Sequence, residues 1–451
     1  MKTTQNQKKE ITKLFHEMDS KSDFLNLLNY TKSLIYGDKM FLFTEKQLNF
    51  YINVSNIKDS NTYKSFEIKK KSGKIRTIHA PNKGLKEFQK CLNIILSLVY
   101  TPHTSAFGFV KGKSIVDNAK KHTNKNYVYN IDLKDFFPSI DASRVWARLK
   151  YPPFNLGTNK NREQIANMIK AICCTPMLVK REIDGEWIAK NTSVLPQGAV
   201  TSPILTNAIC EKLDIQLTGL SKRFGLNYSR YADDITFSSM HNTYTSEKGN
   251  QEAIYKREST FDIELRRIIS SQNFHINEKK VRLQKRGYKQ EVTGIIVNEK
   301  VNTSNYYIKE LRQWIYFWES KGYDKAYELF LKKYIKNKGI ATNSKPNMHL
   351  VIEGKLLYLK MVKGETNTTY LKLKSRFDKL LENKTVKKPS LLETLKNTSN
   401  KTPNGIDLSS FSLNEFNETV KKRKEKNKTI DVIIETIIND GLDNAMKLYK
   451  P

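Results

Sequence analysis

Three acidic residues stand at two places in the chain where carboxylates could gather for metal chemistry. Asp132 ends the apolar segment YVYNIDL (127–133), and Asp233 and Asp234 are adjacent within YSRYADDITFSS (228–239). Adjacent carboxylates at the tip of a hairpin repel each other unless water or a cation separates them. An isolated Asp-Asp pair is typical of a solvated turn. A further acid at the end of an apolar strand favours a shared metal site instead.

Carboxylates grouped in this way suit the extension of a nucleic acid chain. Two Mg²⁺ ions held about 3.5–4 Å apart by hard carboxylate oxygens can activate a 3′-hydroxyl group and neutralise a departing pyrophosphate. The long interval between Asp132 and Asp233 is compatible with neighbouring strands of one sheet. The sequence therefore predicts that the strands carrying these acids lie next to each other.

The segments around the acids predict a mixed α/β unit, with strands at 127–133 and on both sides of the Asp-Asp pair. The other expected elements are helices within about 1–60, a hairpin at 66–80, helices at 86–100, 139–149, 203–224 and 261–272, strands near 281–297, and helices through 305–382. After about residue 384, Lys, Asn, Ser and Thr replace the large apolar residues. This composition predicts a polar linker and a C-terminal extension of unknown role.

The charge of the chain favours a polyanionic partner. Its 451 residues include 78 Lys and Arg against 46 Asp and Glu, a net charge of +32, and basic side chains release counterions when they bind phosphates. A membrane surface is the alternative partner for such a charge, but no apolar run is long enough to cross a bilayer. The four cysteines lack paired spacing and the N-terminus lacks a signal-peptide stretch. We therefore expect a cytoplasmic protein without a membrane partner.

Three segments give the chain a specific resemblance to a known family. NIDLKDFFPSI (130–140), LPQGAVTSPILTNAI (195–209) and YADDITFSS (231–239) follow one another as the motifs of reverse transcriptases do, and the resemblance extends from about 66 to 300. GFVKGKS (108–114) is one residue short of a P-loop pattern. It resembles instead the second block of the reverse transcriptase series, which lies near template and primer.

The resemblance implies an RNA-directed DNA polymerase with an α+β, right-hand fold of fingers, palm and helical thumb. The implied domains are N-terminal helices and fingers at 1–125, the palm at 126–300 with part of the fingers interleaved at about 150–195, an RNA-binding thumb at 301–383, and the polar linker and extension at 384–451.

The same resemblance assigns the catalytic residues. Asp132, Asp233 and Asp234 fall on the metal-binding aspartates of the family, and the backbone carbonyl of Leu133 would be a further ligand of the two Mg²⁺ ions. Lys280, in INEKKV, resembles the lysine that protonates pyrophosphate as it leaves. A lysine on a solvated face is the alternative interpretation for Lys280.

Nucleotide-binding residues are implied in three segments. Phe137 lies where the family carries an aromatic residue that excludes a 2′-hydroxyl group, although a plain core phenylalanine is the alternative. Gln197 could hydrogen-bond the incoming nucleotide, and Gly198 permits close approach of the backbone. Lys74 and Arg76, in the basic hairpin, resemble residues that clamp the triphosphate.

Two short signatures narrow the resemblance to retron reverse transcriptases. Asn118 to His122 reads as NAxxH, and Val292, Thr293 and Gly294 read as VTG. The resemblance implies that Asn118, His122 and the VTG residues bind RNA, and as short polar groups Asn118 and His122 could either bind a folded RNA or order a loop. The implied partner is a structured non-coding RNA that serves as template and primer, and the implied product is a branched RNA–DNA (msDNA) made from dNTPs.

The resemblance also implies anti-phage defence, with a separate effector protein as a further partner. A group II intron-type enzyme or another defence-associated reverse transcriptase is the alternative within the family. A catalytically dead RNA-binding scaffold is the alternative outside enzymes. The intact acids at 132, 233 and 234 argue against a scaffold, which has no use for a repulsive cluster.

Overall fold

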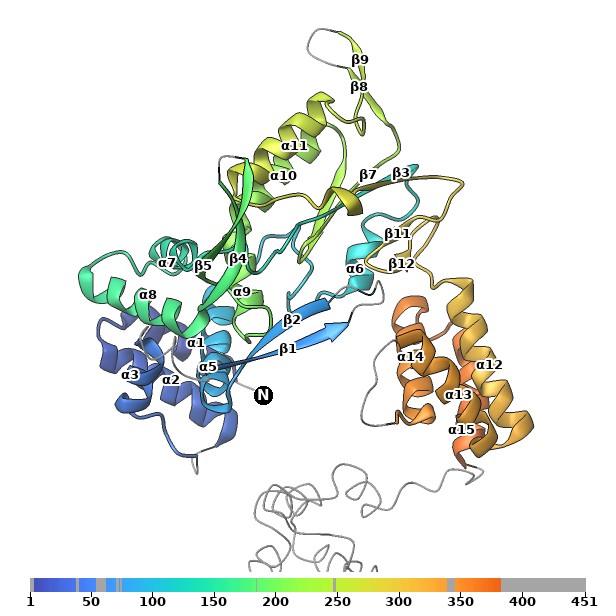
Figure 1. Cartoon of the computed structure of the whole chain (residues 1–451), viewed down its shortest axis with the longest axis horizontal. Helices are drawn as coiled ribbons and strands as arrows, with labels where there is room; N and C mark the ends of the chain where they lie inside the picture. The colour runs from blue at the N-terminus through green and yellow to red at the C-terminus, as the bar shows by residue number, and fades with distance from the viewer. Residues whose placement is uncertain are drawn as a thin grey trace, which may run out of the picture. The chain divides into compact units, whose positions relative to one another are not determined.

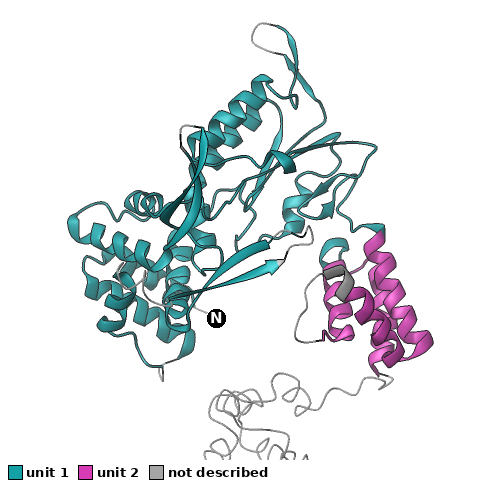
Figure 2. Cartoon of the chain, viewed as in Figure 1, with its two compact units in different colours: residues 1–305, 361–364 teal, residues 306–360, 365–451 magenta. Residues whose placement is uncertain are grey.

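The computed structural model describes residues 4–37, 40–53, 62–69, 73, 75–183, 185–245, 249–338 and 345–382. The elements are labelled along the chain in Figure 1, and the chain divides into two compact units, which Figure 2 shows in different colours. Unit 1 comprises residues 1–305 and 361–364, and unit 2 comprises residues 306–360 and 365–451. The predicted linker and extension at 384–451 lie outside the described residues.

A four-stranded antiparallel sheet forms the centre of unit 1. Its strand order is β10 (Arg282–Lys285), β3 (Tyr127–Asp132), β7 (Asp234–Ser239) and β6 (Asn227–Tyr231). The two central strands, β3 and β7, are mostly buried along their length, which matches their β-branched and aromatic composition. The prediction that the strands carrying these acids lie next to each other is therefore confirmed.

Helices cover the sheet through an aromatic core. α10 (Glu211–Arg223) contacts β6 and α11 (Thr260–Ser271). Phe237 of β7 stacks on Tyr228 with ring centroids 5.1 Å apart and meets Phe261 of α11 edge to face at 5.3 Å. Both aromatic arrangements are favourable beyond the area that they bury.

One helix expected from the sequence is two helices in the structure. The segment 203–224 forms α9 (Ser202–Ile209) and α10, with Cys210 ending one and beginning the other. The break at Cys210 was not predicted, because the apolar pattern continues through it without glycine or proline.

The N-terminal part of unit 1 is a group of helices with clear sequence signals. Thr4 and Thr44 form capping boxes at the starts of α1 and α3, which satisfy amide groups that have no partner within the helix. The buried face of α5 carries Leu85, Phe88, Leu92 and Ile95, a spacing typical of one helix side. The helices of this group are α1 (Gln5–Glu17), α2 (Lys21–Tyr36), α3 (Glu45–Ile52), α5 (Lys83–Val99), α7 (Ala142–Lys150) and α8 (Lys160–Cys173).

Two long hairpins also belong to unit 1. β1 (Tyr63–Lys69) pairs with β2 (Ile75–Pro81), which confirms the hairpin expected at 66–80. β4 (Thr175–Ile183) pairs with β5 (Glu186–Val194). The shorter elements are α6 (Ile115–Lys120), β8 (Thr243–Thr245), β9 (Gln251–Ala253), the 3₁₀ turn η1 (Glu278–Lys280), β11 (Glu291–Val292) and β12 (Ile295–Ile296).

Unit 2 consists of helices around a separate core. In that core Trp314 meets Phe330 edge to face, and Trp318 meets Phe377 in the same way. Both tryptophans are buried, so they are core residues rather than exposed stacking platforms. The helices are α12 (Asn305–Lys321), α13 (Tyr323–Lys338), α14 (Met348–Lys363) and α15 (Thr368–Glu382). Within the described part of the chain, no helix has the length and apolar character needed to span a membrane.

Candidate functional site

The Asp-Asp pair lies at the turn between β6 and β7. Tyr231 pairs with Asp234 as the last rung of the ladder, so Ala232 and Asp233 form the turn itself. Ala232 has a left-handed backbone, with φ of 57°, and is buried. A non-glycine residue in this region is uncommon, so the surrounding contacts must hold the turn in place.

Strand pairing brings the three acids together. Asp132 is directly opposite Asp234 in the register of β3 and β7. The amide of Leu133 donates to the carbonyl of Asp233 at 3.0 Å, so the chain beyond β3 follows the turn that carries the pair. The convergence expected from the sequence is therefore observed.

Burial and neighbouring negative charge raise the pKa values of Asp233 and Asp234. Loss of surrounding water, followed by repulsion from Asp132, raises the pKa of Asp233 above its usual value. The pKa of Asp234 is raised to about 6, first by loss of water and then by the charges of Asp233 and Asp132. Lys280 opposes both shifts. A donor set of hard oxygens with uncompensated negative charge suits Mg²⁺ by its chemistry.

Asp132 already has a hydrogen-bond partner at each carboxylate oxygen. Asn277 Nδ2 donates to Oδ1 at 2.8 Å, and Lys280 Nζ donates to Oδ2 at 2.6 Å. The turn η1 fixes both partners, because the Asn277 amide also donates to the Asp132 carbonyl at 2.8 Å. As the side chains stand, no group of three His, Cys, Asp or Glu among the described residues is arranged around one metal position. A cation at Oδ2 would exchange with the Lys280 ammonium.

The segment LPQG is attached to the β1–β2 hairpin. The amide of His79 donates to the carbonyl of Gln197 at 2.8 Å. A Cβ at Gly198 would lie only 2.5 Å from the His79 carbonyl oxygen, so only glycine fits there. Arg76, on the same strand as His79, is exposed and lowers the pKa of Asp233 by its charge. Lys74 lies outside the described residues.

The two adjacent phenylalanines after Asp132 differ in burial. Phe136 is buried and packs on Phe274 with ring centroids 5.6 Å apart, as expected of a core residue. Phe137 is only partly buried, and its ring lies 6.0 Å from that of Phe109. Phe137 therefore has the exposure that contact with a substrate requires.

Comparison with known proteins places this arrangement in a family. The family model for reverse transcriptase (RNA-dependent DNA polymerase) matches residues 68–297, which include the three acids and the residues around them described in this section. The chain belongs to the reverse transcriptase family.

The relatives of this family member include retron enzymes. It is 35% identical over 242 residues to the retron Mx162 reverse transcriptase of Myxococcus xanthus, covering 52% of this chain and 47% of that protein. The retron Mx65 reverse transcriptase of the same organism is 34% identical, with 54% and 52% covered. The retron Ec86 reverse transcriptase of Escherichia coli is 33% identical, with 55% and 68% covered. The match thus spans about half the length of the two Myxococcus proteins.

Among solved structures, apo telomerase from Candida tropicalis matches with 14% identity and a TM-score of 0.34. The match covers 54% of this chain and 55% of that one. A likeness of this size carries no argument.

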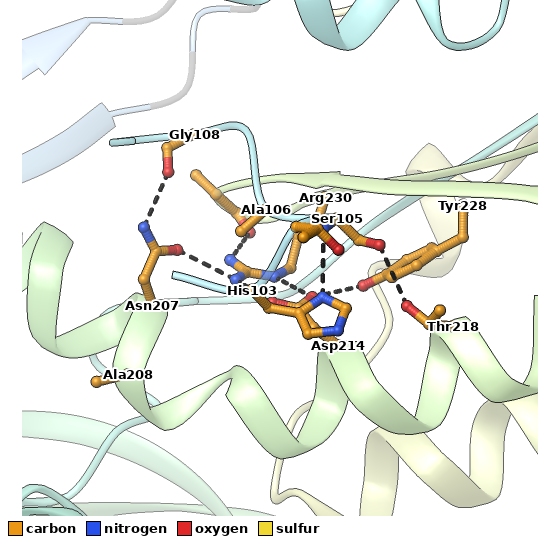
Figure 3. A network of polar contacts seen from close by, with 12 residues as sticks. His103, Ser105, Ala106, Gly108, Asn207, Ala208, Asp214, Thr218, Tyr228 and Arg230 are labelled. Carbon is orange, nitrogen blue, oxygen red and sulfur yellow. Dashed lines mark hydrogen bonds and ion pairs between the residues drawn. The ribbon is translucent and has the colours of Figure 1, made fainter. Parts of the chain in front are cut away.

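A buried ion pair, drawn in Figure 3, supports the turn that bears Asp233. Arg230 and Asp214 are both fully buried, with Arg230 Nη2 2.6 Å from Asp214 Oδ2 and Arg230 Nε 2.8 Å from Oδ1. Burial alone would lower the pKa of Arg230, but the Asp214 carboxylate holds it well above its usual value. Arg230 Nη1 donates to the Ala232 carbonyl at 3.2 Å, and Nη2 donates to Asn207 at 3.1 Å. The guanidinium therefore links α9 and α10 to the turn that bears Asp233.

Sequence reasoning missed this ion pair. Arg230 lies two residues after Tyr228 in β6, so the two side chains share one side of the strand, and both are buried. A charged residue at a core position of a strand requires a buried partner, and this position was the available signal for Arg230. It did not identify Asp214, which lies on a helix and is brought near only by packing.

The NAxxH and VTG signatures lie together in a second buried network. The two ring nitrogens of His122 each lie 2.7 Å from a hydroxyl oxygen, one from Ser238 and the other from Ser229. Ser229 in turn donates to Asn118 Oδ1 at 2.6 Å, and Asn118 Nδ2 is 3.5 Å from the Thr293 hydroxyl. The pKa of His122 is lowered to about 3, and burial is the main cause. The network joins α6, the central sheet and the β11–β12 hairpin.

Burial limits what these residues can touch. The side chains of Asn118, His122 and Val292 are buried, whereas Gly294 is exposed at the hairpin turn with φ of 81°. The binding of RNA by these residues stays a prediction. Such binding would use the turn at Thr293 and Gly294, with the buried residues holding that turn in position.

Proposed function

We propose that this chain is an RNA-directed DNA polymerase of the retron type. The observation that carries the proposal is the β3–β7 register, which places Asp132 opposite Asp234 and beside Asp233 in a member of the reverse transcriptase family. The retron enzymes among its relatives support the narrower assignment.

The proposed architecture is a right hand. The central sheet with α10 and α11 is the palm, the β1–β2 hairpin belongs to the fingers, and unit 2 is the thumb. The charge of Arg76 on this hairpin acts on Asp233, and the hairpin is attached to LPQG, which supports the fingers assignment.

In the proposed mechanism Asp132, Asp233, Asp234 and the carbonyl of Leu133 hold two Mg²⁺ ions. Bound there, the ions would lower the pKa of the primer hydroxyl and neutralise the leaving pyrophosphate. Asn277 orients the Asp132 carboxylate through its bond to Oδ1. Lys280, whose ammonium reaches the same carboxylate and whose side chain is 57% exposed, supplies a proton to the pyrophosphate.

The nucleotide is held by residues on three segments. Arg76, with Lys74 near it in sequence, binds the triphosphate, since a guanidinium can pair with two phosphate oxygens at once. Gln197 hydrogen-bonds the nucleotide, and Gly198 keeps the backbone close to β2. Phe137 packs beneath the sugar and excludes a 2′-hydroxyl group.

The proposed partner is a structured non-coding RNA that acts as template and primer. DNA synthesis from a 2′-hydroxyl of that RNA gives a branched RNA–DNA, with dNTPs as substrates. The net charge of +32 supports a nucleic acid partner. Because its relatives include retron enzymes, we also propose that the protein acts in the cytoplasm. There it would take part in anti-phage defence together with a separate effector protein.

The nucleic acid that copurifies with the protein tests this function. The full chain is purified from cells that carry its native locus, and the bound nucleic acid is treated with RNase or with a debranching enzyme. A species of DNA whose length and mobility change after debranching is expected. DNA free of any RNA branch would favour another prokaryotic reverse transcriptase. Failure to extend a primed RNA template under any Mg²⁺ concentration would overturn the polymerase assignment itself.

A further inference from the structure

Phe109 is a large aromatic residue in a costly conformation at an exposed position. Its side chain is 46% exposed, and its backbone φ is 61°. Bulky residues are rare in this left-handed region, because the side chain crowds the backbone there. Strain of this kind persists where the surroundings fix the backbone, and it is concentrated at functional sites.

The segment before Phe109 is fixed against the catalytic turn. A Cβ at Gly108 would lie 2.4 Å from the Ala232 amide nitrogen, so the two backbones are in close contact. Asn207 Nδ2 donates to the Gly108 carbonyl at 3.0 Å, as Figure 3 shows. The amide of Phe107 donates to the Arg230 carbonyl at 2.8 Å. The catalytic turn therefore determines where Phe109 lies.

The ring of Phe109 ends a row of aromatic rings that begins in the core. Phe274 packs on Phe136, Phe136 packs on Phe137 at 5.6 Å, and Phe137 lies 6.0 Å from Phe109. All three distances are within the range of favourable aromatic pairs. Exposure increases along the row, from buried Phe274 and Phe136 to partly buried Phe137 and exposed Phe109.

We infer that Phe109 is a specificity-determining residue that forms one wall of the sugar pocket together with Phe137. This inference rests on the proposed function. The Phe109 ring holds Phe137 on its open side and extends the apolar surface that the nucleotide sugar meets. A 2′-hydroxyl group against two rings would be crowded and would lose its water without gaining a hydrogen-bond partner, which is unfavourable. Sugar selection therefore depends on the pair of rings rather than on Phe137 alone.

A double-mutant cycle tests the inference in the full chain with its RNA. Phe109→Ala, Phe137→Ala and the double variant are compared for incorporation of dNTPs and rNTPs on a primed RNA template. Phe109→Asn is included because asparagine adopts left-handed φ readily, so the turn is kept while the ring is removed. Phe41→Ala, at a phenylalanine that is 91% exposed in the N-terminal part of unit 1, is the matched control.

Both Phe109 variants are expected to lose about 3- to 10-fold in discrimination between dNTP and rNTP, with a higher KM for dNTP. The double variant is expected to discriminate no worse than Phe137→Ala, because coupled residues are not additive. Unchanged discrimination and KM in Phe109→Asn, or losses that multiply in the double variant, would overturn the inference. A wild-type chain that synthesises no DNA overturns the proposed function instead.

Discussion

The three carboxylates of the site are held close together at an electrostatic cost to the fold. The pKa values of Asp233 and Asp234 are raised, so their ionised forms are less stable in the folded chain than in the unfolded chain. This contribution opposes folding more strongly as pH rises through the usual carboxyl range. The proximity of these carboxylates therefore lowers the stability of the fold at neutral pH.

Replacing one carboxylate by an amide separates these two effects. Asp233→Asn should reduce DNA synthesis on the order of 100-fold or more, since a charged group acting at the reacting atoms is lost. The same variant should melt at the same or a higher temperature than wild type in Mg²⁺-free buffer at neutral pH, because repulsion is relieved. Primer extension and a thermal melt measure the two effects.

Asp135→Asn is the matched control for that experiment. Asp135 is exposed beside the site and has a left-handed φ of 46°, which asparagine also accepts. It should retain synthesis near the wild-type rate. If Asp233→Asn synthesised DNA at the wild-type rate, the assignment of Asp233 to the active site would be wrong.

The sequence was a better guide to which side chains lie together than to whether a polar side chain is exposed or buried. Asp132, Asp233 and Asp234 could be selected because strand ends and adjacent acids are visible in the sequence. Asn118 and His122 were predicted to bind RNA or to order a loop; both are buried and hydrogen-bonded within the protein, and their binding of RNA stays a prediction. Polarity alone does not distinguish a surface contact from a buried hydrogen-bond network.

At the scale of elements, the site depends on strand register and on the helices that support the turn. The hairpin at 66–80 and the strand at 127–133 were predictable from alternation and turn residues. The break between α9 and α10 and the pairing of Arg230 with Asp214 were not, because both arise from packing between segments distant in sequence. Local patterns specify elements more fully than they specify the contacts between them.

The Arg230–Asp214 pair should be essential for both stability and activity. Asp214→Asn should lower the free energy of unfolding by about 3–5 kcal/mol, because it leaves a buried charge without its partner. Replacing both residues, as in Arg230→Met with Asp214→Leu, should recover part of the stability but not the activity. The double variant lacks the hydrogen bond from Arg230 to the Ala232 carbonyl. Urea denaturation and primer extension provide the two measurements.

An exposed ion pair gives the comparison for that effect. Glu319→Gln removes a partner of Arg376, in a pair whose side chains are 39% and 32% exposed. Its effect should be below about 1 kcal/mol. Full activity in the Arg230→Met, Asp214→Leu double variant would show that the buried Arg230–Asp214 pair supports folding alone.

The buried His122 should make folding sensitive to acid. Its pKa is lowered from 6.5 to about 3, so the unfolded chain binds a proton that the folded chain does not. Stability from this residue is therefore complete above pH 6.5 and is lost as pH falls, by about 2 kcal/mol at pH 5. Urea denaturation at pH 7 and pH 5 should show a smaller difference for His122→Gln than for wild type. Equal differences would show that His122 is not the source.

At the scale of the whole molecule, two units and a strong positive charge are the main features. In the sequence, the boundary between the units at 305 and 306 comes after the four-stranded sheet and before a helical core with its own aromatic residues. The change from mixed segments to helical segments near 300 was visible in the sequence. RNA recognition by the proposed thumb depends on which side chains lie on its surface. The periodicity of apolar residues predicts the helices but not the RNA that they bind.

The net charge of +32 predicts that RNA binding is strongly dependent on salt. Affinity should fall on the order of 1,000-fold between 50 and 200 mM KCl if several phosphates are neutralised. Filter binding of the copurified RNA across a salt series measures the slope. Asp233→Asn should give the same slope as wild type, because it leaves the basic surface intact. An affinity that is independent of salt would exclude phosphate contacts as the main source of binding.

The ion pair between Lys280 and Asp132 occupies a carboxylate oxygen that the proposed mechanism assigns to metal binding. Under the proposed mechanism, a magnesium ion that binds at Asp132 Oδ2 would displace the Lys280 ammonium, so one positive charge would replace another. The displaced amine would then be free to turn toward the leaving pyrophosphate.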